Sequence, residues 1–205
     1  MRVRRLTLGM LDTNCWVVDD GAGGPAIVID PADGAGEILD ALGGAPVGAL
    51  ALTHGHFDHI GAVRELVAAT AAPLLVHEAD ADSITTAVGS GGAPFGFEVS
   101  APSADRVLTA GDTIVAGAVA LTVLHTPGHT PGCICLLGDG HLFSGDTLFA
   151  GSIGRTDFPG GDMAAMRRSI ARLAELPDEV RVHPGHGPET TIGRERRVNP
   201  YFPRA

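Results

Sequence analysis

Lysine is absent from this sequence of 205 residues, so all 14 basic residues are arginine. The 24 acidic residues outnumber them and give a net charge of −10 at pH 7, which repels the phosphate backbone of nucleic acids. Long apolar runs are also missing, and the basic start at residues 1–9 lacks the apolar core of a signal peptide. We therefore expect a cytoplasmic protein without a nucleic-acid or membrane partner.

Cysteine is scarce, and its three positions do not have the spacing of a disulfide framework. This usage is typical of a reducing compartment. Cys133 and Cys135 are two residues apart in a predicted strand, which would place both on one face. Burial in the core is the favoured interpretation, because cysteine is among the most buried residue types; metal binding and a strained bridge are the alternatives.

The hydrophobic content of 44% is enough for one sizeable core, and we expect one domain over residues 1–205. Apolar patterns predict strands at residues 3–8, 14–19, 25–30, 47–52, 73–76, 106–108, 113–115, 119–125, 133–137 and 141–143. Helical patterns cover residues 35–41, 62–70, 78–88 and 162–174, with Gly61 at the start of the second. The pattern fits an α/β sandwich of two sheets with helices outside. Other α/β sandwiches share this periodicity, so the pattern does not distinguish between them. Residues 89–104, rich in Gly, Ser, Ala and Pro, are interpreted as an insertion.

Residues 53–59 read Thr-His-Gly-His-Phe-Asp-His and directly follow the apolar run at residues 47–52. Three imidazoles and a carboxylate therefore share one short turn. Such groups bind zinc, iron or manganese, and without a cation they would be unpaired beside the end of a buried strand. A metal site is our first hypothesis.

Three further segments place a His or Asp in a sharp Gly- or Pro-containing turn after a strand-like run. They are Thr126-Pro-Gly-His129, Ser144-Gly-Asp146 and His183-Pro-Gly-His186. If the four strand ends converge, they assemble seven donors: His54, His56, Asp58, His59, His129, Asp146 and His186. Seven donors are too many for one ion and suit two, with Asp146 as the bridge because a carboxylate has two oxygens.

Other polar residues have weaker claims. His77, His125, His141 and His183 are isolated, and we expect surface or core roles for them, with His183 the strongest exception. Asp30 and Asp157 are interpreted as turn residues or as carboxylates that orient the imidazoles of the site.

The His-x-His-x-Asp-His run, with the later His, Asp and His in this order, resembles the metallo-β-lactamase superfamily over almost the whole chain. Within it, residues 151–161 and the tail at residues 186–196 resemble the short, single-domain relatives of glyoxalase II, the hydroxyacylglutathione hydrolases. The resemblance implies an αββα sandwich of two mixed β-sheets with helices on the outer faces. It also implies one metal on His54, His56 and His129, a second on Asp58, His59 and His186, and Asp146 as the bridge.

We therefore predict a binuclear metal-dependent hydrolase, a thioesterase for S-lactoylglutathione-like or related acyl thioesters or esters. Zinc is the first metal expected, with iron or manganese also open. A hydroxide between two cations is a nucleophile at neutral pH, and a leaving thiolate needs no general acid. Asp58 is the predicted catalytic residue, both as a ligand and by orienting the nucleophile.

The substrate is less well determined by the sequence. Larger glyoxalase II enzymes end in a helical domain that helps to hold glutathione, so glutathione recognition is open here. Arg155 is the candidate clamp for a substrate carboxylate, and a plain surface arginine is the alternative. Phe57, and Phe95 and Phe97 in the 89–104 loop, could wall an acyl pocket or anchor their segments to the core.

Two alternative functions remain. A persulfide dioxygenase of the same fold would use a single iron on His54, His129 and Asp146. A metal-binding protein without turnover is the other. Hydrolysis of β-lactams or lactones is also open, although the single tyrosine, Tyr201, lies in the tail and offers no evident help to a lactone substrate.

Overall fold

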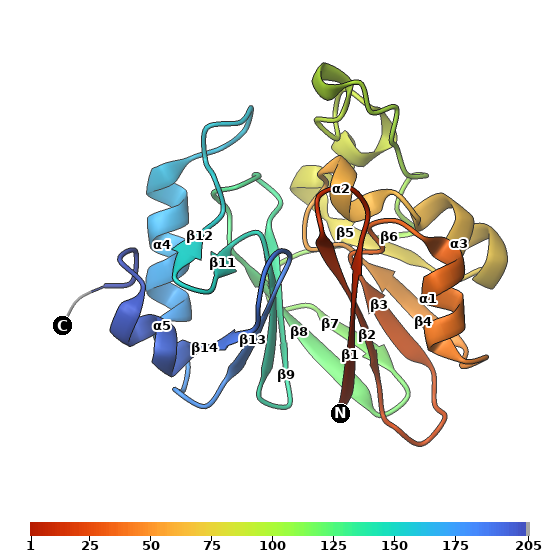
Figure 1. Ribbon diagram of the computed structural model, residues 1–205, viewed down its shortest axis with the longest axis horizontal. Helices are drawn as coiled ribbons and strands as arrows, with labels where there is room; N and C mark the ends of the chain where they lie inside the picture. Colours follow the sequence, from red (N-terminus) through yellow and green to blue (C-terminus); the bar gives the residue numbers. More distant parts are fainter. Residues whose placement is uncertain (204–205) are drawn as a thin grey trace.

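The computed structural model describes residues 1–203 and contains two six-stranded β-sheets with helices on their outer sides (Figure 1). The first sheet has the order β1-β2-β3-β4-β5-β6, with β1 (Arg2–Leu8), β2 (Thr13–Asp19), β3 (Ala26–Ile29), β4 (Val47–Ala51), β5 (Leu74–His77) and β6 (Arg106–Leu108). Strands β1 to β3 pair antiparallel, and the pairs from β3 to β6 are parallel.

The second sheet has the order β14-β13-β10-β9-β8-β7. Its strands are β7 (Thr113–Ala116), β8 (Val119–His125), β9 (Ile134–Gly138), β10 (His141–Gly145), β13 (Arg181–Pro184) and β14 (Thr190–Thr191). Only β10 and β13 are parallel neighbours here, and β11 (Leu148–Phe149) pairs with β12 (Ser152–Ile153) in a separate ribbon. Both sheets are mixed, as predicted for the αββα sandwich.

The helices lie on the two outer faces of the sandwich. They are α1 (Ala35–Leu42), α2 (Phe57–Ile60), α3 (Val63–Thr70), α4 (Met163–Leu173) and α5 (Ile192–Val198). The first three accompany the first sheet, and α4 and α5 accompany the second (Figure 1). Asp162 begins α4 by accepting hydrogen bonds from the backbone N–H groups of Ala164 and Ala165, which would otherwise lack partners.

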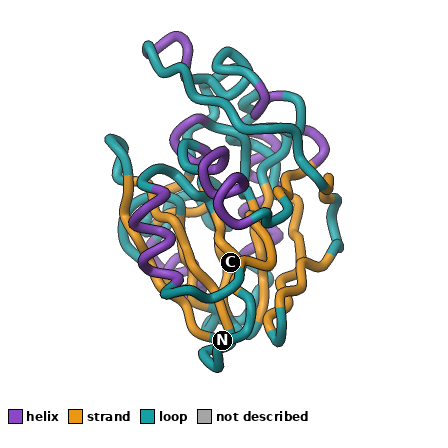
Figure 2. The backbone as a smooth tube through the Cα atoms, turned by 90° about the vertical axis from the view of Figure 1, so that its right-hand side faces the viewer, coloured by secondary structure: helices purple, strands orange, loops and turns teal. Residues whose placement is uncertain are grey.

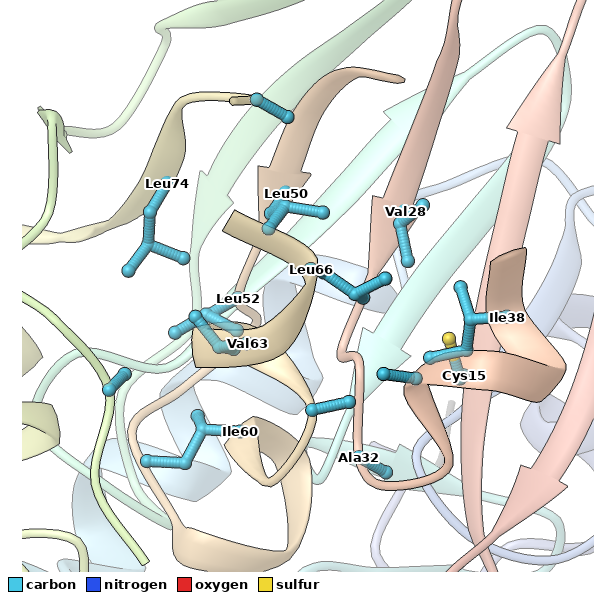
Figure 3. Packing of buried hydrophobic residues seen from close by; sticks show 14 of the residues in the cluster. Cys15, Val28, Ala32, Ile38, Leu50, Leu52, Ile60, Val63, Leu66 and Leu74 are labelled. Carbon is cyan, nitrogen blue, oxygen red and sulfur yellow. The ribbon is translucent and has the colours of Figure 1, made fainter. Parts of the chain in front are cut away.

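Alternation along the strands divides the apolar core into three layers. In β2, Cys15 and Val17 face the α1–α3 side, whereas Trp16 and Val18 point into the space between the sheets. Figure 3 shows the first of these layers, where Leu50 of β4 lies near Leu66 of α3. This packing places the strand ends of both sheets at a common edge.

The segment at residues 78–88 was predicted as a helix, and this prediction is wrong. The chain forms two 3-10 turns instead, η1 (Glu78–Asp80) and η2 (Ser83–Thr85). The Oγ of Ser83 donates to the carbonyl of Asp80 over 2.8 Å, and the Oγ1 of Thr85 donates to that of Asp82 over 2.7 Å. Such side-chain bonds compete with the bonds of a regular helix.

Smaller differences concern Gly61, the C-terminal helix and one cysteine. Gly61 does not begin a helix but lies between α2 and α3, where a Cβ would collide with the carbonyl oxygen of Ala32. Helix α5 was not predicted; it is short, and Thr191 caps its start by accepting from the N–H of Arg194. Cys133 precedes β9, so it does not share a strand with Cys135, and all three cysteines are buried and free.

Loops gather at the end of the sandwich opposite the N-terminus, including the segment of residues 78–104 with η3 (Ala93–Phe95) (Figure 2). Within residues 1–203, no helix is both long and apolar enough to cross a membrane.

Candidate metal centre

Four loops from the two sheets meet at this end of the molecule. They follow β4, β8, β10 and β13, so each begins where a buried strand ends. Backbone hydrogen bonds join the sheets here: the N–H of Asn14 donates to the carbonyl of Gly185, and that of Ile134 donates to the carbonyl of Thr53. The loop residues are therefore held in place by the strands on both sides.

One group of donors comprises His54, His56 and His129, called here the first donor set. One nitrogen of each ring lies within 4.8 Å of the others. The Nδ1 of His56 and the Nε2 of His129 are 2.8 Å apart. The side chain of His54 is completely buried.

The second donor set comprises Asp58, His59 and His186, again with one donor atom each within 4.8 Å of the others. The Oδ2 of Asp58 lies 3.2 Å from the Nε2 of His186 and 3.6 Å from the Nε2 of His59. Short helix α2 carries both Asp58 and His59, and this turn aims them at the same point.

Asp146 lies between the two sets. Its Oδ1 is 3.4 Å from the Nε2 of His59, and its Oδ2 is 3.5 Å from the Nε2 of His129. Gly185 permits this position, because a Cβ there would overlap the Asp146 carboxylate. The structure thus brings together all seven side chains that the sequence singled out.

Hydrogen bonds at the far side of the rings orient most of these imidazoles. The Nδ1–H groups of His129 and His186 donate to the carbonyls of Arg155 and Leu11, over 2.7 and 3.1 Å. The Nδ1 of His59 is 3.0 Å from the carboxylate of Asp30. A neutral ring that donates from Nδ1 has its free electron pair on Nε2, directed toward the centre.

Asp30 meets the expectation of an orienting carboxylate, since it also accepts from the N–H and the Oγ1 of Thr53, each over 2.7 Å. Asp157 does not orient an imidazole. Its carboxylate instead pairs with the guanidinium of Arg155, over two contacts of 2.7 Å.

The chemistry of the seven side chains fits divalent metals. The Nε2 atoms of His54 and His59 and the Oδ1 of Asp146 are buried without a hydrogen-bond partner in the described chain, a costly situation that a cation relieves. Burial lowers the pKa of His54 well below its ordinary value, and burial and His129 lower the pKa of His56 to about 4. Both rings are therefore neutral at pH 7, which is the form that binds a metal.

The second donor set has a different charge balance. Burial alone would lower the pKa of His59, but Asp58 and Asp146 raise it well above its ordinary value. Burial alone would raise the pKa of Asp58, but His59 and His186 hold it well below its ordinary value. The Asp58 carboxylate is therefore ionised at neutral pH.

One important residue, Asp80, was not identified from the sequence. Its carboxylate is buried and accepts from the N–H of Gly55, the Oγ1 of Thr130 and the N–H of Gly132, over 2.9, 2.7 and 2.8 Å. It therefore fastens the loop of His54 and His56 to the loop of His129. No local pattern reveals it, since its partners are distant in sequence.

The four other histidines lie outside the donor sets, as expected. His77 stacks on His125 with ring centroids 4.1 Å apart. His183 contacts His141, with 2.8 Å between ring nitrogens, and its Nδ1 lies 2.7 Å from the Glu189 carboxylate. His183 is therefore not an exception.

A cavity of about 320 Å³ opens beside the donors. Its lining includes Leu11, His56, Phe57, Asp58, Gly91, Phe95, Phe97, His129, Asp146, Arg155, Phe158 and His186. The phenylalanines of the 89–104 loop thus wall the cavity and do not anchor the loop in the core. A substrate in this cavity would have direct access to the donors of both sets.

Comparison with known proteins agrees with this arrangement. The sequence model of the metallo-beta-lactamase superfamily matches residues 8–186, the region that contains all seven donors. The chain belongs to this superfamily. The recognition from the His-x-His-x-Asp-His run is thereby confirmed at the level of the metallo-β-lactamase superfamily.

Three similar proteins illustrate the range of similarity. The crystal structure of BLEG-1 B3 metallo-beta-lactamase is 35% identical, with a TM-score of 0.90 over 98% of this chain and 99% of that one. The crystal structure of TTHA1623 in a di-iron-bound form is 40% identical, with a TM-score of 0.88 over 98% and 100%. Hydroxyacylglutathione hydrolase GloC of Haemophilus influenzae is 32% identical over 98% of both chains. Relatives in Aquifex aeolicus and Mycobacterium leprae, 41% and 36% identical over 98% of this chain, bear names that state no activity.

Proposed function

We propose that this protein is a binuclear metal-dependent hydrolase that cleaves small-molecule acyl thioesters. The observation that carries the proposal is the pair of donor sets on either side of Asp146, open to one cavity. A pair of divalent metals held by these donors would lower the pKa of a bound water toward about 7 and would polarise a carbonyl. We assign zinc first, and iron second because of the di-iron relative.

Asp58 is the proposed catalytic residue of this chain. Its carboxylate lines the cavity, is 14% exposed and is ionised at neutral pH because of His59 and His186. From this position it accepts a hydrogen bond from the attacking water and orients it toward the substrate carbonyl. The Oγ1 of Thr13 donates to its Oδ2 over 3.2 Å and helps to fix the carboxylate.

A thioester suits this site better than an amide. An amide nitrogen must be protonated as it leaves, whereas a thiolate is a weak base and departs without an acid. The similarity to GloC, which is named as a hydroxyacylglutathione hydrolase, supports the same substrate class. The similarity to BLEG-1 favours β-lactam hydrolysis as the second candidate.

The test uses one protein sample purified without added metal. Its metal-to-protein ratio and metal identity are measured, and S-lactoylglutathione and a β-lactam are assayed in parallel. We expect about two metals per chain and turnover of the thioester. A single iron per chain with oxygen uptake on a glutathione persulfide, and no thioester hydrolysis, would contradict the proposal.

Asp58→Asn tests the assigned role. The amide keeps the size of the side chain but loses the ionised oxygen, so we expect kcat to fall by about 100-fold or more while the fold is retained. Circular dichroism and metal content are measured on the same preparation. Unchanged turnover at full metal content would show that Asp58 is not a catalytic residue.

A further inference from the structure

Aromatic side chains form one wall of the cavity. Phe57 of α2 stacks on Phe97, with ring centroids 4.8 Å apart and an interplanar angle of 16°. Phe95 continues the stack, 6.3 Å from Phe57, and reaches Phe158 at 6.0 Å. We call Phe57, Phe95, Phe97 and Phe158 the aromatic wall. All four line the cavity, and Phe95 is 58% exposed at its mouth.

The wall lies directly beside the proposed chemistry. Phe57 precedes Asp58 in the chain, and the ring of Phe158 lies 6.1 Å from that of His56 in the first donor set. Phe57 is held by its own backbone, because its N–H donates to the carbonyl of Ser90 over 2.9 Å. A group attached to a carbonyl carbon that reacts at these donors is therefore within reach of this wall.

Apart from the proposed metals, the cavity offers little to a negatively charged group of a substrate. Arg155 is the arginine in its lining, and its guanidinium is paired with Asp157 through two hydrogen bonds of 2.7 Å. The same guanidinium lies 3.7 Å from the centre of the Phe158 ring. Its charge is thus already balanced and one of its faces is covered. The net charge of −10 adds repulsion at long range.

Apolar surface extends beyond the wall. A second cavity of about 220 Å³ shares Leu11, Phe57, Asp58 and Phe97 with the first, so Phe57 and Phe97 lie between the two. The turn between β1 and β2 borders this second cavity with Met10, which is 79% exposed, and Leu11, which is 49% exposed. Exposed large apolar residues that gather at the mouth of a cavity mark a binding surface for an apolar group.

From these contacts we infer that the cavity selects thioesters with an apolar acyl group, with Phe95 and Phe97 as specificity-determining residues. The inference rests on the proposed thioesterase function. It assigns the acyl group to the aromatic wall and gives glutathione no dedicated contact. Each methylene buried against the wall raises kcat/KM by up to about fourfold.

The experiment varies the acyl group on one neutral thiol. The metal-loaded enzyme is assayed with acetyl, lactoyl, butanoyl, hexanoyl and benzoyl thioesters of N-acetylcysteamine, and with S-lactoylglutathione. We expect kcat/KM for the hexanoyl and benzoyl compounds to exceed that for the acetyl compound at least about tenfold. Exchanging the thiol of the lactoyl compound should change kcat/KM by less than this acyl effect.

Substitutions in the aromatic wall test whether it causes the preference for apolar acyl groups. Phe97→Ala and Phe95→Ala should each reduce the ratio of hexanoyl to acetyl kcat/KM at least about threefold, whereas Phe97→Leu, which keeps an apolar surface, should restore most of it. Tyr201→Ala is the matched control, because Tyr201 is 45% exposed and outside the cavity lining. The ratio in this control should equal that of the unaltered protein.

Two results overturn the inference, and they differ from each other. Hydrolysis of all thioesters without acyl preference, or with a larger effect of the thiol than of the acyl group, overturns it and leaves the proposed function intact. No hydrolysis of any thioester by the metal-loaded protein overturns both the proposed function and the inference that rests on it.

Discussion

Asp30 shows how one residue can organise a metal centre from outside it. The residue has a φ of 50°, in the left-handed region, at the end of β3. Its two oxygens accept from the N–H and Oγ1 of Thr53 and contact the Nδ1 of His59. It therefore fixes both the backbone before His54 and the tautomer of His59.

Asp30→Asn provides a test at this scale. An amide has one accepting oxygen, so its NH₂ group must face either the N–H of Thr53 or both the Oγ1 of Thr53 and the Nδ1 of His59. We expect the metal affinity to fall about 10- to 100-fold, measured by competition with a chelator of known affinity. Asp40→Asn, an exposed substitution in α1, is the control and should retain the original affinity. Equal affinities in the two variants would contradict the orienting role of Asp30.

Turns and loops, more than regular helices and strands, position the donors. The 3-10 turn η1 illustrates this, because it directs Asp80 inward to join two ligand-bearing loops. Gly132 must be a glycine for the same reason, since a Cβ there would overlap the carboxylate of Asp80. A regular helix over residues 78–88 would not deliver these contacts.

Asp80→Ala should loosen the connection between the two loops. It leaves the N–H groups of Gly55 and Gly132 buried without their acceptor, at a cost of about 1–3 kcal/mol each. We expect a lower free energy of unfolding in urea. We also expect the first donor set to bind metal more weakly, measured as a lower metal-to-protein ratio after dialysis. Asp82→Ala, at an exposed site two residues away, is the control. A variant with the stability and metal content of this control would exclude the linking role.

Sequence patterns predicted most strands and three of the four proposed helices, because alternation reflects which face each residue buries. They failed at residues 78–88, where distant partners for Asp80 and local bonds of Ser83 override the helical pattern. The sequence singled out the seven side chains that the structure brings together, because each lies in a sharp turn after an apolar strand. The roles of Phe57, Phe95 and Phe97 were left undecided, since their positions depend on how the 89–104 loop folds back over α2, and Phe158 was not considered.

At the scale of the whole molecule, each donor set combines residues from both sheets. The loop after β4 supplies His54 and His56 to the first set, and the loop after β8 supplies His129. The second set likewise joins α2 to His186, after β13. A metal in either set therefore connects the two halves of the sandwich, and its binding energy contributes to the stability of the whole fold.

Metal removal should accordingly lower the melting temperature. Free metal at 100 times its Kd adds about 2.7 kcal/mol, and for a chain of this size that corresponds to roughly 5–10 °C. Calorimetry of the loaded protein before and after a chelator measures the difference. His54→Ala, which lacks one donor, should show a smaller difference. Identical melting temperatures with and without metal would show that metal does not connect the halves.

The order of the donors along the chain has a consequence for biosynthesis. A ribosome has released residues 54–59 long before it adds His129, and His186 comes later still. Neither donor set is complete in a nascent chain that ends before its last member, so early segments can hold a cation only weakly. Metal binding is thereby postponed until His129 has been added for the first set, or His186 for the second, and the two halves of the sandwich have docked.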